Sequence, residues 1–329
     1  MTNADSKSLK TQVSVIIPVY NGSRTIAEAL DSVFCQTFDD YEVIVVNDAS
    51  PDNSVEILES YGSRIKLVSL TENRGQSAAR NLGASLAQAE LLAFLDQDDV
   101  WYPRKLECQV ALLDQHPEVG LVYSDLDEVD EECHYKTLAV HRSYAMGHPK
   151  LSLVHVIIGD LFILPSTVLC RKRWFEKVGG FDECLMGYED DDLWIRMWPT
   201  CRFAYVPEAL AKWRVHRTSS SESLLMERSR QIFYQKLMSQ FANDPYMQGV
   251  VRKRFYSVYR SRGTQLLRRG EKTRARAHYW MALRNRPCAA SMLCRWAFTF
   301  LPRRLIRLTD SAWQKLKSLP LFGPRRQYL

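Results

Sequence analysis

Three carboxylates stand within four residues at Asp96, Asp98 and Asp99, directly after the apolar run Leu91–Leu95. Repulsion between carboxylates this close is costly unless a positive group sits among them. Mg²⁺ or Mn²⁺ suits such a cluster, because a hard divalent cation takes one or two carboxylates and completes its shell with phosphate oxygens and water. The spacing predicts a metal site for a phosphorylated substrate, and a polar turn that caps the next helix is the alternative.

A second acidic run, Glu189 to Asp192, opens the predicted helix Asp190–Trp198. The start of a helix is a favourable place for anions, because the helix dipole is positive there. Asp192 lies three residues beyond Glu189, so both side chains lie on a similar helix face. The run is a second candidate for chemistry, with a charged helix cap as its alternative.

Short apolar strands alternate with helices in the first half of the chain. Strands of this kind, separated by helices of about a dozen residues, indicate right-handed strand–helix–strand units and a mainly parallel sheet flanked by helices. Ligands bind such sheets beyond the carboxyl ends of the strands, where Asn47, Asp48, Asp96 and Asp98 are expected. The predicted strands are Val13–Val19, Glu42–Val46, Ile65–Leu70 and Leu91–Leu95, and the helices between them are 25–36, 52–61 and 76–88.

The later segments are less regular, and the segment 126–163 has weak periodicity and is a candidate for acceptor-binding loops. Beyond Ser223 the pattern is almost wholly helical. We therefore predict a catalytic domain over residues 1–222 and a basic, mainly helical region over residues 223–329. The remaining predicted elements are helices at 104–115 and 171–178 and strands at 119–124 and 166–170.

The net charge of +6 conceals two parts of opposite sign. Residues 228–329 carry 23 Lys and Arg against three acids, whereas residues 1–227 carry 21 basic and 35 acidic residues. The two parts are therefore expected to meet different partners. The content of 46% hydrophobic and 25% charged residues is that of a globular protein and excludes a disordered chain.

The eight cysteines form no C-x-x-C pair and no metal-finger spacing, which favours a reducing compartment. Residues 1–10 are polar, and no window approaches the roughly 20 apolar residues of a membrane span. We expect a cytoplasmic protein, with peripheral attachment to the inner face of the cell membrane as an open alternative.

The order of the motifs resembles family 2 of the inverting glycosyltransferases, which have the GT-A fold and use nucleotide-sugar donors. Six segments spread over about two hundred residues make the resemblance specific. They are V-S-V-I-I-P-V-Y-N-G (Val13–Gly22), V-V-N-D-A-S-P-D (Val45–Asp52), N-R-G-Q-S-A-A-R-N (Asn73–Asn81), F-L-D-Q-D-D (Phe94–Asp99), G-Y-E-D-D-D-L-W-I-R (Gly187–Arg196) and W-R-V-H (Trp213–His216).

The resemblance implies that Pro18, Tyr20, Asn47 and Asp48 bind the nucleobase and ribose of the donor. Asn47 departs from the Asp that is commoner at this position in the family. An amide both donates and accepts hydrogen bonds, whereas a carboxylate only accepts, so the base preference is left open. Arg80 is the candidate for the diphosphate, because a guanidinium is always charged and contacts phosphate bidentately. A surface helix residue is the alternative for Arg80.

The same resemblance makes Asp98 the preferred metal ligand, with Asp96 closer to the ribose or bound through water and Asp99 a further possible ligand. His216 matches the family's late histidine and is a candidate for metal or phosphate contact, with a structural role as the alternative. A bound cation would stabilise the charge that grows on the leaving diphosphate.

Asp190 matches the general base of the family. A sugar hydroxyl is a poor nucleophile at neutral pH, so an inverting displacement needs a base that takes its proton. Because Asp190 lies at a helix start, we expect it to stay ionised. Glu189 is expected to orient the acceptor or a loop, with Asp192 in a supporting role.

Two absences narrow the reaction class. The chain lacks the Q-x-x-R-W segment of processive polysaccharide synthases, so addition of one or a few sugars is expected, in surface glycan or polysaccharide synthesis. It also lacks the glycine-rich motifs of dehydrogenases and P-loop enzymes. A nucleotidyltransferase or a catalytically silent nucleotide-binding module is the alternative. The donor sugar, the acceptor, the linkage and the oligomeric state are not predicted.

The basic region interleaves Arg and Lys with aromatic residues, as in 252–260 and 296–307. Amphipathic basic helices of this kind bind anionic bilayers, and a helical cap packed on the catalytic domain is the alternative. The segment Gly270–Pro287 resembles a helical hairpin. Nucleic-acid binding is a third interpretation, which the acidic first half disfavours because it would repel a polyanion.

Overall fold

The computed structural model describes residues 11–158, 162–216 and 224–286, together with residues 293, 296–297 and 299–300. The chain divides into two compact units at Lys236 and Leu237. This division lies inside helix α9 (Leu224–Gln240), later than the predicted boundary at residue 222. Within these described ranges, no helix is both long enough and apolar enough to cross a bilayer.

Four parallel strands form the first half of the sheet, in the spatial order β3-β2-β1-β4. The β-branched residues of β1 and β2 are buried on both faces, as expected of strands covered by helices on each side. The predicted strands are confirmed within about two residues at each end. Their bounds are β1 (Val13–Val19), β2 (Tyr41–Asn47), β3 (Lys66–Ser69) and β4 (Leu91–Phe94).

The second half of the sheet is mixed and continues in the order β8-β6-β9-β5. Strand β8 is antiparallel to both β4 and β6, and β9 is parallel to β6. The short strands β5 and β7 pair antiparallel with β9 and β6. The bounds are β5 (Val100–Trp101), β6 (Val119–Val129), β7 (Tyr135–Thr137), β8 (Val168–Arg171) and β9 (Arg202–Arg214).

Strand β9 was not predicted, although it is the longest strand of the sheet. Its sequence holds Pro207 and Glu208, which divide its apolar residues into the short runs 203–206 and 209–211. In the pairing with β6, Ser124 faces Val206 and Asp125 faces Ala209, so Pro207 and Glu208 stand in an irregularity without partners. A proline is tolerated in a sheet at such a bulge because no ladder hydrogen bond is lost there.

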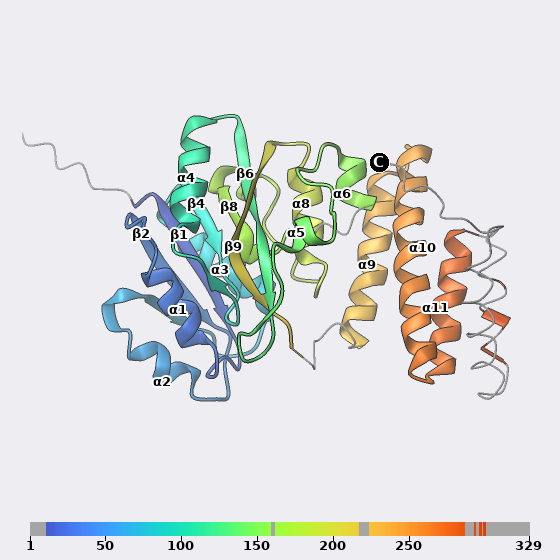
Figure 1. Ribbon diagram of the computed structural model, residues 1–329, viewed down its shortest axis with the longest axis horizontal. Helices are drawn as coiled ribbons and strands as arrows, with labels where there is room; N and C mark the ends of the chain where they lie inside the picture. The colour runs from blue at the N-terminus through green and yellow to red at the C-terminus, as the bar shows by residue number, and fades with distance from the viewer. Residues whose placement is uncertain are drawn as a thin grey trace, which may run out of the picture. The chain divides into compact units, whose positions relative to one another are not determined.

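Helices cover both faces of the sheet in the first unit (Figure 1). Helices α1, α2 and α4 share one core with the odd-numbered residues of β1. Gly83 of α3 packs on Ile16 from the other face, where Phe94 also contacts Phe175 and Phe181. The predicted mainly parallel, helix-flanked sheet is confirmed. The helix bounds are α1 (Ile26–Phe34), α2 (Ser54–Glu59), α3 (Gln76–Leu86), α4 (Lys105–Gln115), α7 (Lys172–Lys177) and α8 (Glu189–Met197), with one-turn η1 (Gly62–Arg64) and η2 (Pro165–Thr167).

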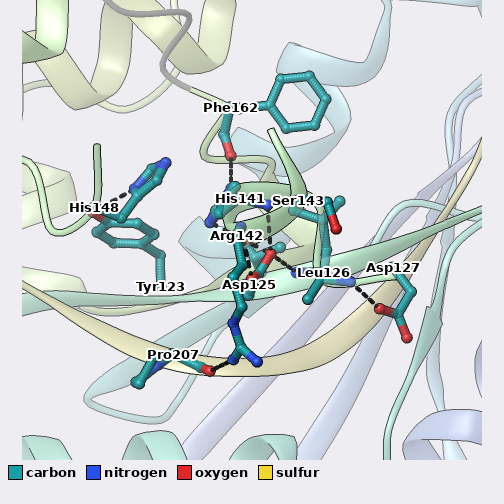
Figure 2. Close-up of polar contacts among 12 residues, drawn as sticks. Tyr123, Asp125, Leu126, Asp127, His141, Arg142, Ser143, His148, Phe162 and Pro207 are labelled. Carbon is teal, nitrogen blue, oxygen red and sulfur yellow. Dashed lines mark hydrogen bonds and ion pairs between the residues drawn. The ribbon is translucent and has the colours of Figure 1, made fainter. Parts of the chain in front are cut away.

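The segment without a firm sequence assignment contains α5 (Val140–Ser143) and α6 (Leu153–Ile158). Figure 2 shows how the buried carboxylate of Asp125 on β6 holds α5, by accepting hydrogen bonds from the backbone N–H groups of His141 and Arg142. The rings of His141 and His148 stack with centroids 3.9 Å apart, and burial lowers the pKa of both. These groups anchor the segment to the sheet through buried contacts.

The second unit contains α10 (Pro245–Arg268) and α11 (Lys272–Asn285), which pack together as a hairpin. Gly270, with φ of +84°, lies in the turn between them. The predicted hairpin over Gly270–Pro287 is therefore wrong, because this segment supplies only the second helix of the pair. The mainly helical pattern beyond Ser223 is confirmed over 224–286. Most of 287–329 lies outside the described residues, and membrane attachment of the tail stays a prediction.

The contact of Gly83 with Ile16 gives a test of the packing between α3 and β1. A Cβ atom at Gly83 would lie 2.5 Å from Cγ2 of Ile16, whereas one at Gly147 would meet nothing within 4 Å. We expect Gly83→Ala to lower the free energy of unfolding by about 1–3 kcal/mol through overpacking. Gly147→Ala is the matched control and should stay within about 0.5 kcal/mol of the parent in chemical denaturation. Equal effects of the two substitutions would contradict this packing.

Candidate active site

A cavity of about 1890 Å³ opens at the carboxyl ends of β1, β2 and β4. Binding sites for single small ligands measure roughly 300–1000 Å³, so this cavity has room for two substrates. Six of the predicted site residues line it, namely Pro18, Tyr20, Asp48, Asp96, Asp98 and His216. The other predicted residues, Asn47, Arg80, Glu189, Asp190 and Asp192, are not among the lining residues.

Gln97 joins the acidic loop after β4 to the loop after β1. Its Oε1 accepts a hydrogen bond from the backbone N–H of Tyr20 at 2.8 Å, and its Nε2 donates to the carbonyl of Tyr20 at 2.9 Å. A Cβ atom at Gly22 would lie 2.5 Å from Oε1 of Gln97, so glycine leaves room for this pairing. The two loops on which Tyr20 and Asp98 stand are thereby fixed to each other.

Asp99, the third carboxylate of the cluster, is buried and is used by the protein itself. One oxygen accepts from the hydroxyl of Ser166 at 2.5 Å, and the other accepts from the backbone N–H of Arg214 at 3.0 Å. Burial, together with Asp98 and Asp96, raises the pKa of Asp99 well above its ordinary value. Both oxygens are occupied, so Asp99 is a support of the loop and a poor candidate for metal ligation.

Arg214, the last residue of β9, holds the acidic loop after β4 in place through its buried guanidinium. Nε donates to the carbonyl of Asp98 at 2.8 Å, and one terminal nitrogen pairs with Glu28 at 2.5 Å. The other terminal nitrogen donates to the carbonyl of Glu131 at 2.9 Å. A rigid fork with several donors suits this task, which a lysine cannot perform.

His216 lies two residues after Arg214, and its Nε2 stands 2.7 Å from a carboxylate oxygen of Asp98. Asp96 and Asp98 each keep about 30% of the side chain exposed, toward the same cavity. Burial and the neighbouring Asp96 raise the pKa of Asp98, and His216 opposes that rise. A carboxylate, an imidazole and a second carboxylate form a donor set that Mg²⁺ or Mn²⁺ accepts.

The charges of the lining residues favour a cation as well. Eight acidic residues line the cavity against four arginines, so the wall is net negative before any substrate enters. Among the described residues, the one group of three possible metal ligands whose ligand atoms all lie within 4.8 Å of one another is Asp130, Glu132 and His134, in a largely exposed turn. One carboxylate oxygen of Asp130 already accepts the backbone N–H groups of Glu132 and His134, which is the ordinary structure of such a turn.

Asn47 and Asp48 end β2, and both side chains are buried. The carboxylate oxygens of Asp48 accept the backbone N–H groups of Arg74 and Gly75, each at 2.7 Å. The amide of Asn47 is hydrogen bonded to Ser69 and to the backbone N–H of Ser50. In this structure the two side chains shape the loops around the predicted nucleotide pocket, and only Asp48 reaches its wall.

Arg80 connects the two acidic motifs. Its guanidinium is almost fully buried and pairs with Asp96 on one side and with Glu189, at 3.4 Å, on the other. Glu189 is also hydrogen bonded to the amide of Gln76. The alternative of a surface helix residue is wrong for Arg80, because the side chain is 1% exposed. Two carboxylates neutralise the charge of Arg80. The side chain therefore lies between the two acidic motifs and is not part of the cavity wall.

Asp190 lies next to this bridge, and burial raises its pKa well above the ordinary value of a carboxyl group. The carboxylates of Asp191 and Glu189 add to the rise, and the Arg80 guanidinium opposes it. The effect of the helix start on Asp190 is opposed, because desolvation and the neighbouring like charges raise the pKa of this carboxyl group. A carboxylate with a raised pKa is a stronger base once it has lost its proton.

Asp192 is buried and its carboxylate is engaged with two cations. Arg196, one helical turn later, lies 2.7 Å away, and Lys236 of α9 lies 2.8 Å from the other oxygen. Lys236 also pairs with Asp182 at 2.7 Å. Asp192 thus ties α8 to α9 within the first unit, and its supporting role is structural.

A helix-flanked, mainly parallel sheet with two acidic motifs joined beside one large cavity defines a glycosyltransferase of the GT-A fold. The sequence model of "Glycosyl transferase family 2" matches residues 14–179. The chain belongs to this family. An "uncharacterized glycosyltransferase" of Rickettsia prowazekii is 33% identical over 214 residues, which cover 65% of this chain and 67% of that protein.

A shorter match comes from Escherichia coli. Its UDP-Glc:alpha-D-GlcNAc-diphosphoundecaprenol beta-1,3-glucosyltransferase is 40% identical over 102 residues, or 31% of this chain and 40% of that protein.

Two solved structures show the same fold at low sequence identity. S. aureus TarS 1–349 in complex with UDP-GlcNAc has a TM-score of 0.67 at 19% identity and covers 92% of each chain. A mannosyltransferase of Pyrobaculum calidifontis in complex with GDP-Man and Mn²⁺ has a TM-score of 0.61 at 20% identity, covering 94% of this chain and 81% of that one.

Three residues of the site were missed by sequence reasoning, namely Gln97, Ser166 and Arg214. Gln97 and Arg214 stand inside the quoted motifs, so their positions were available, but their roles depend on contacts with residues at least 77 positions away in the chain. Ser166 had no motif at all. Its signal is only that it precedes β8, which runs beside β4.

The fork of Arg214 gives a test of the support beneath Asp98. We expect Arg214→Lys to keep the charge but lose most of the contacts, lowering the free energy of unfolding by about 1–3 kcal/mol. It should also weaken stabilisation by Mn²⁺ with nucleotide-sugar, read as a shift in melting temperature. Lys212→Met, on the same strand and over the Tyr102 and Tyr135 rings, is the matched control and should retain that stabilisation. If Arg214→Lys also retained the stabilisation by Mn²⁺ with nucleotide-sugar, the proposed support of Asp98 by Arg214 would be refuted.

Proposed function

We propose that this protein transfers a sugar, with inversion, from a nucleoside diphosphate to a hydroxyl of a saccharide or lipid-linked acceptor. The observation that carries the proposal is the buried Arg80, which pairs with Asp96 of one acidic motif and Glu189 of the other. A donor-binding motif and a base-bearing motif 93 residues apart in the chain, Asp96 and Glu189, thereby share one arginine. The UDP-GlcNAc and GDP-Man bound by the two solved relatives support a nucleotide-sugar donor.

In this proposal a divalent cation, Mg²⁺ or Mn²⁺, is held by Asp98 and His216, with Asp96 beside them. The residue types fit, because the Asp98 carboxylate and the His216 imidazole lie 2.7 Å apart and the partly exposed Asp96 carboxylate lines the same net negative wall. The Mn²⁺ in the mannosyltransferase complex supports the assignment. When bound, the cation supplies positive charge beside the departing diphosphate.

Asp190 is proposed as the general base. A carboxylate oxygen of Asp190 takes the proton of the acceptor hydroxyl while the acceptor oxygen forms its bond to the anomeric carbon of the donor. The bond between that carbon and the diphosphate oxygen breaks on the opposite face, and the nucleoside diphosphate leaves with the electron pair. Glu189 keeps Asp190 in place through Arg80 and Gln76. Pro18, Tyr20 and Asp48 are proposed to surround the nucleoside.

Separate variants test the two motifs. A panel of nucleotide-sugars is first screened for metal-dependent thermal stabilisation, since a ligand that binds only the folded state raises its apparent stability. With the selected donor, we expect Asp98→Ala to abolish metal-dependent binding. Asp190→Asn should leave binding nearly intact and reduce turnover by roughly a hundredfold or more. Equal loss of donor affinity in both variants, or a panel without any stabilising nucleotide-sugar, would count against the function.

The raised pKa of Asp190 predicts the pH dependence of transfer. The base must be deprotonated, so kcat should rise with pH through the pKa of Asp190, at a pH above the ordinary carboxyl range. Asp191→Asn removes a neighbouring negative charge, lowers the pKa of Asp190, and should move this rise to lower pH. Asp40→Asn, directly before the amino end of β2, is the control. An unmoved profile in Asp191→Asn would exclude Asp190 as the titrating base.

A further inference from the structure

The first half of α9 forms part of the cavity wall. Ser229 accepts the backbone N–H of Met186 at 2.9 Å, and the ring of Tyr188 stacks on Phe233 at 5.3 Å. Gly187 has φ of +74°, and a Cβ atom there would lie 2.0 Å from the end of the Met226 side chain. The loop that leads into Glu189 and Asp190 is therefore packed against α9.

One face of α9 lines the cavity and carries both apolar side chains and a cationic one. Leu225, Arg228 and Ile232 recur at spacings of three and four residues, which puts them on one side of a helix, and all three line the cavity. Leu225 is 58% exposed, although it is apolar. This face, which we call the α9 face, therefore offers apolar contact on either side of one guanidinium.

The charge of Arg228 stands out against the rest of the wall. Of the four arginines that line the cavity, Arg74 pairs with Glu183 and Arg214 with Glu28. Within the described part of the chain, Arg24 and Arg228 form no ion pair with an acidic side chain, and Arg24 stands in the loop after β1, on the proposed nucleoside side. Arg228 is thus a free cation that borders the loop leading to the proposed base.

We propose that the α9 face is the acceptor subsite and takes a sugar linked through diphosphate to an isoprenoid lipid. Arg228 binds the diphosphate, because a guanidinium contacts phosphate oxygens bidentately, and Leu225 and Ile232 contact the first isoprenoid units. The inference rests on the proposed function, for which it names the acceptor class. The E. coli relative, whose acceptor is printed as alpha-D-GlcNAc-diphosphoundecaprenol, supports this class.

Farnesyl diphosphate tests the subsite without knowledge of the acceptor sugar. Its binding to the full chain is measured by equilibrium dialysis with Mn²⁺ and with UDP and GDP together in excess, so that the nucleotide pocket is filled whichever base it prefers. We expect binding that Arg228→Met weakens by roughly tenfold and Leu225→Ser weakens severalfold. Arg228 and Leu225 are exposed, so melting temperatures should stay unchanged.

Arg202→Met is the matched control, since Arg202 is also exposed but does not line the cavity, and it should bind like the parent. Lack of binding by the parent, or equal binding by Arg228→Met, would each overturn the proposal. Competition by inorganic pyrophosphate as effective as farnesyl diphosphate would overturn its lipid part.

The outcome is separable from that of the proposed function. Arg228-dependent binding of farnesyl diphosphate, together with no nucleotide-sugar binding, would reject the glycosyl transfer and keep the lipid-diphosphate site. Suppose instead that donor binding requires metal and is lost in Asp98→Ala, while Arg228→Met does not change farnesyl diphosphate binding. The glycosyl-transfer function would then stand, and this acceptor class would be rejected.

Discussion

The buried ion pairs of Arg80 with Asp96 and Glu189 are the constraint on which the active site depends. A guanidinium removed from water is costly unless its charge is matched, and leaving either carboxylate unmatched would be costly as well. The carboxyl end of β4 and the start of α8 are therefore held together by the two ion pairs of Arg80. Through this bridge, groups from two distant motifs are kept beside one cavity in the absence of substrate.

Crowding of acids shapes the rest of the site. One carboxylate of the first motif has a structural role, because both oxygens of Asp99 accept hydrogen bonds, from Ser166 and from the backbone of Arg214. Asp96 and Asp98 remain partly exposed, and burial and repulsion raise the pKa of Asp98. In the second motif the same two causes raise the pKa of Asp190. In both motifs, like charges held close together oppose full ionisation unless a positive group lies among them.

Much of the fold was predictable, because buried strands have a local signature. The apolar run of β1 indicates a strand wherever it stands, and the four-strand parallel half of the sheet followed from such runs. Strand β9 has no such continuous signature, because Pro207 and Glu208 interrupt it. Its stability comes from pairing with β6, which is distant in sequence, and the pairing accommodates Pro207 in a bulge. The boundary at residue 222 was drawn where the helical pattern begins, whereas α9 joins the first unit through Lys236.

The sequence by itself determined the family, the parallel half of the sheet and the identity of both acidic motifs, because residue types and their spacing along the chain carry that information. Only the tertiary structure decided how the acids divide their tasks. It buried Asp99 and Arg80, left Asp98 facing His216, and turned one side of α9 toward the cavity. The physical reason is that burial and charge pairing are set by neighbours distant in sequence, and no local pattern encodes them.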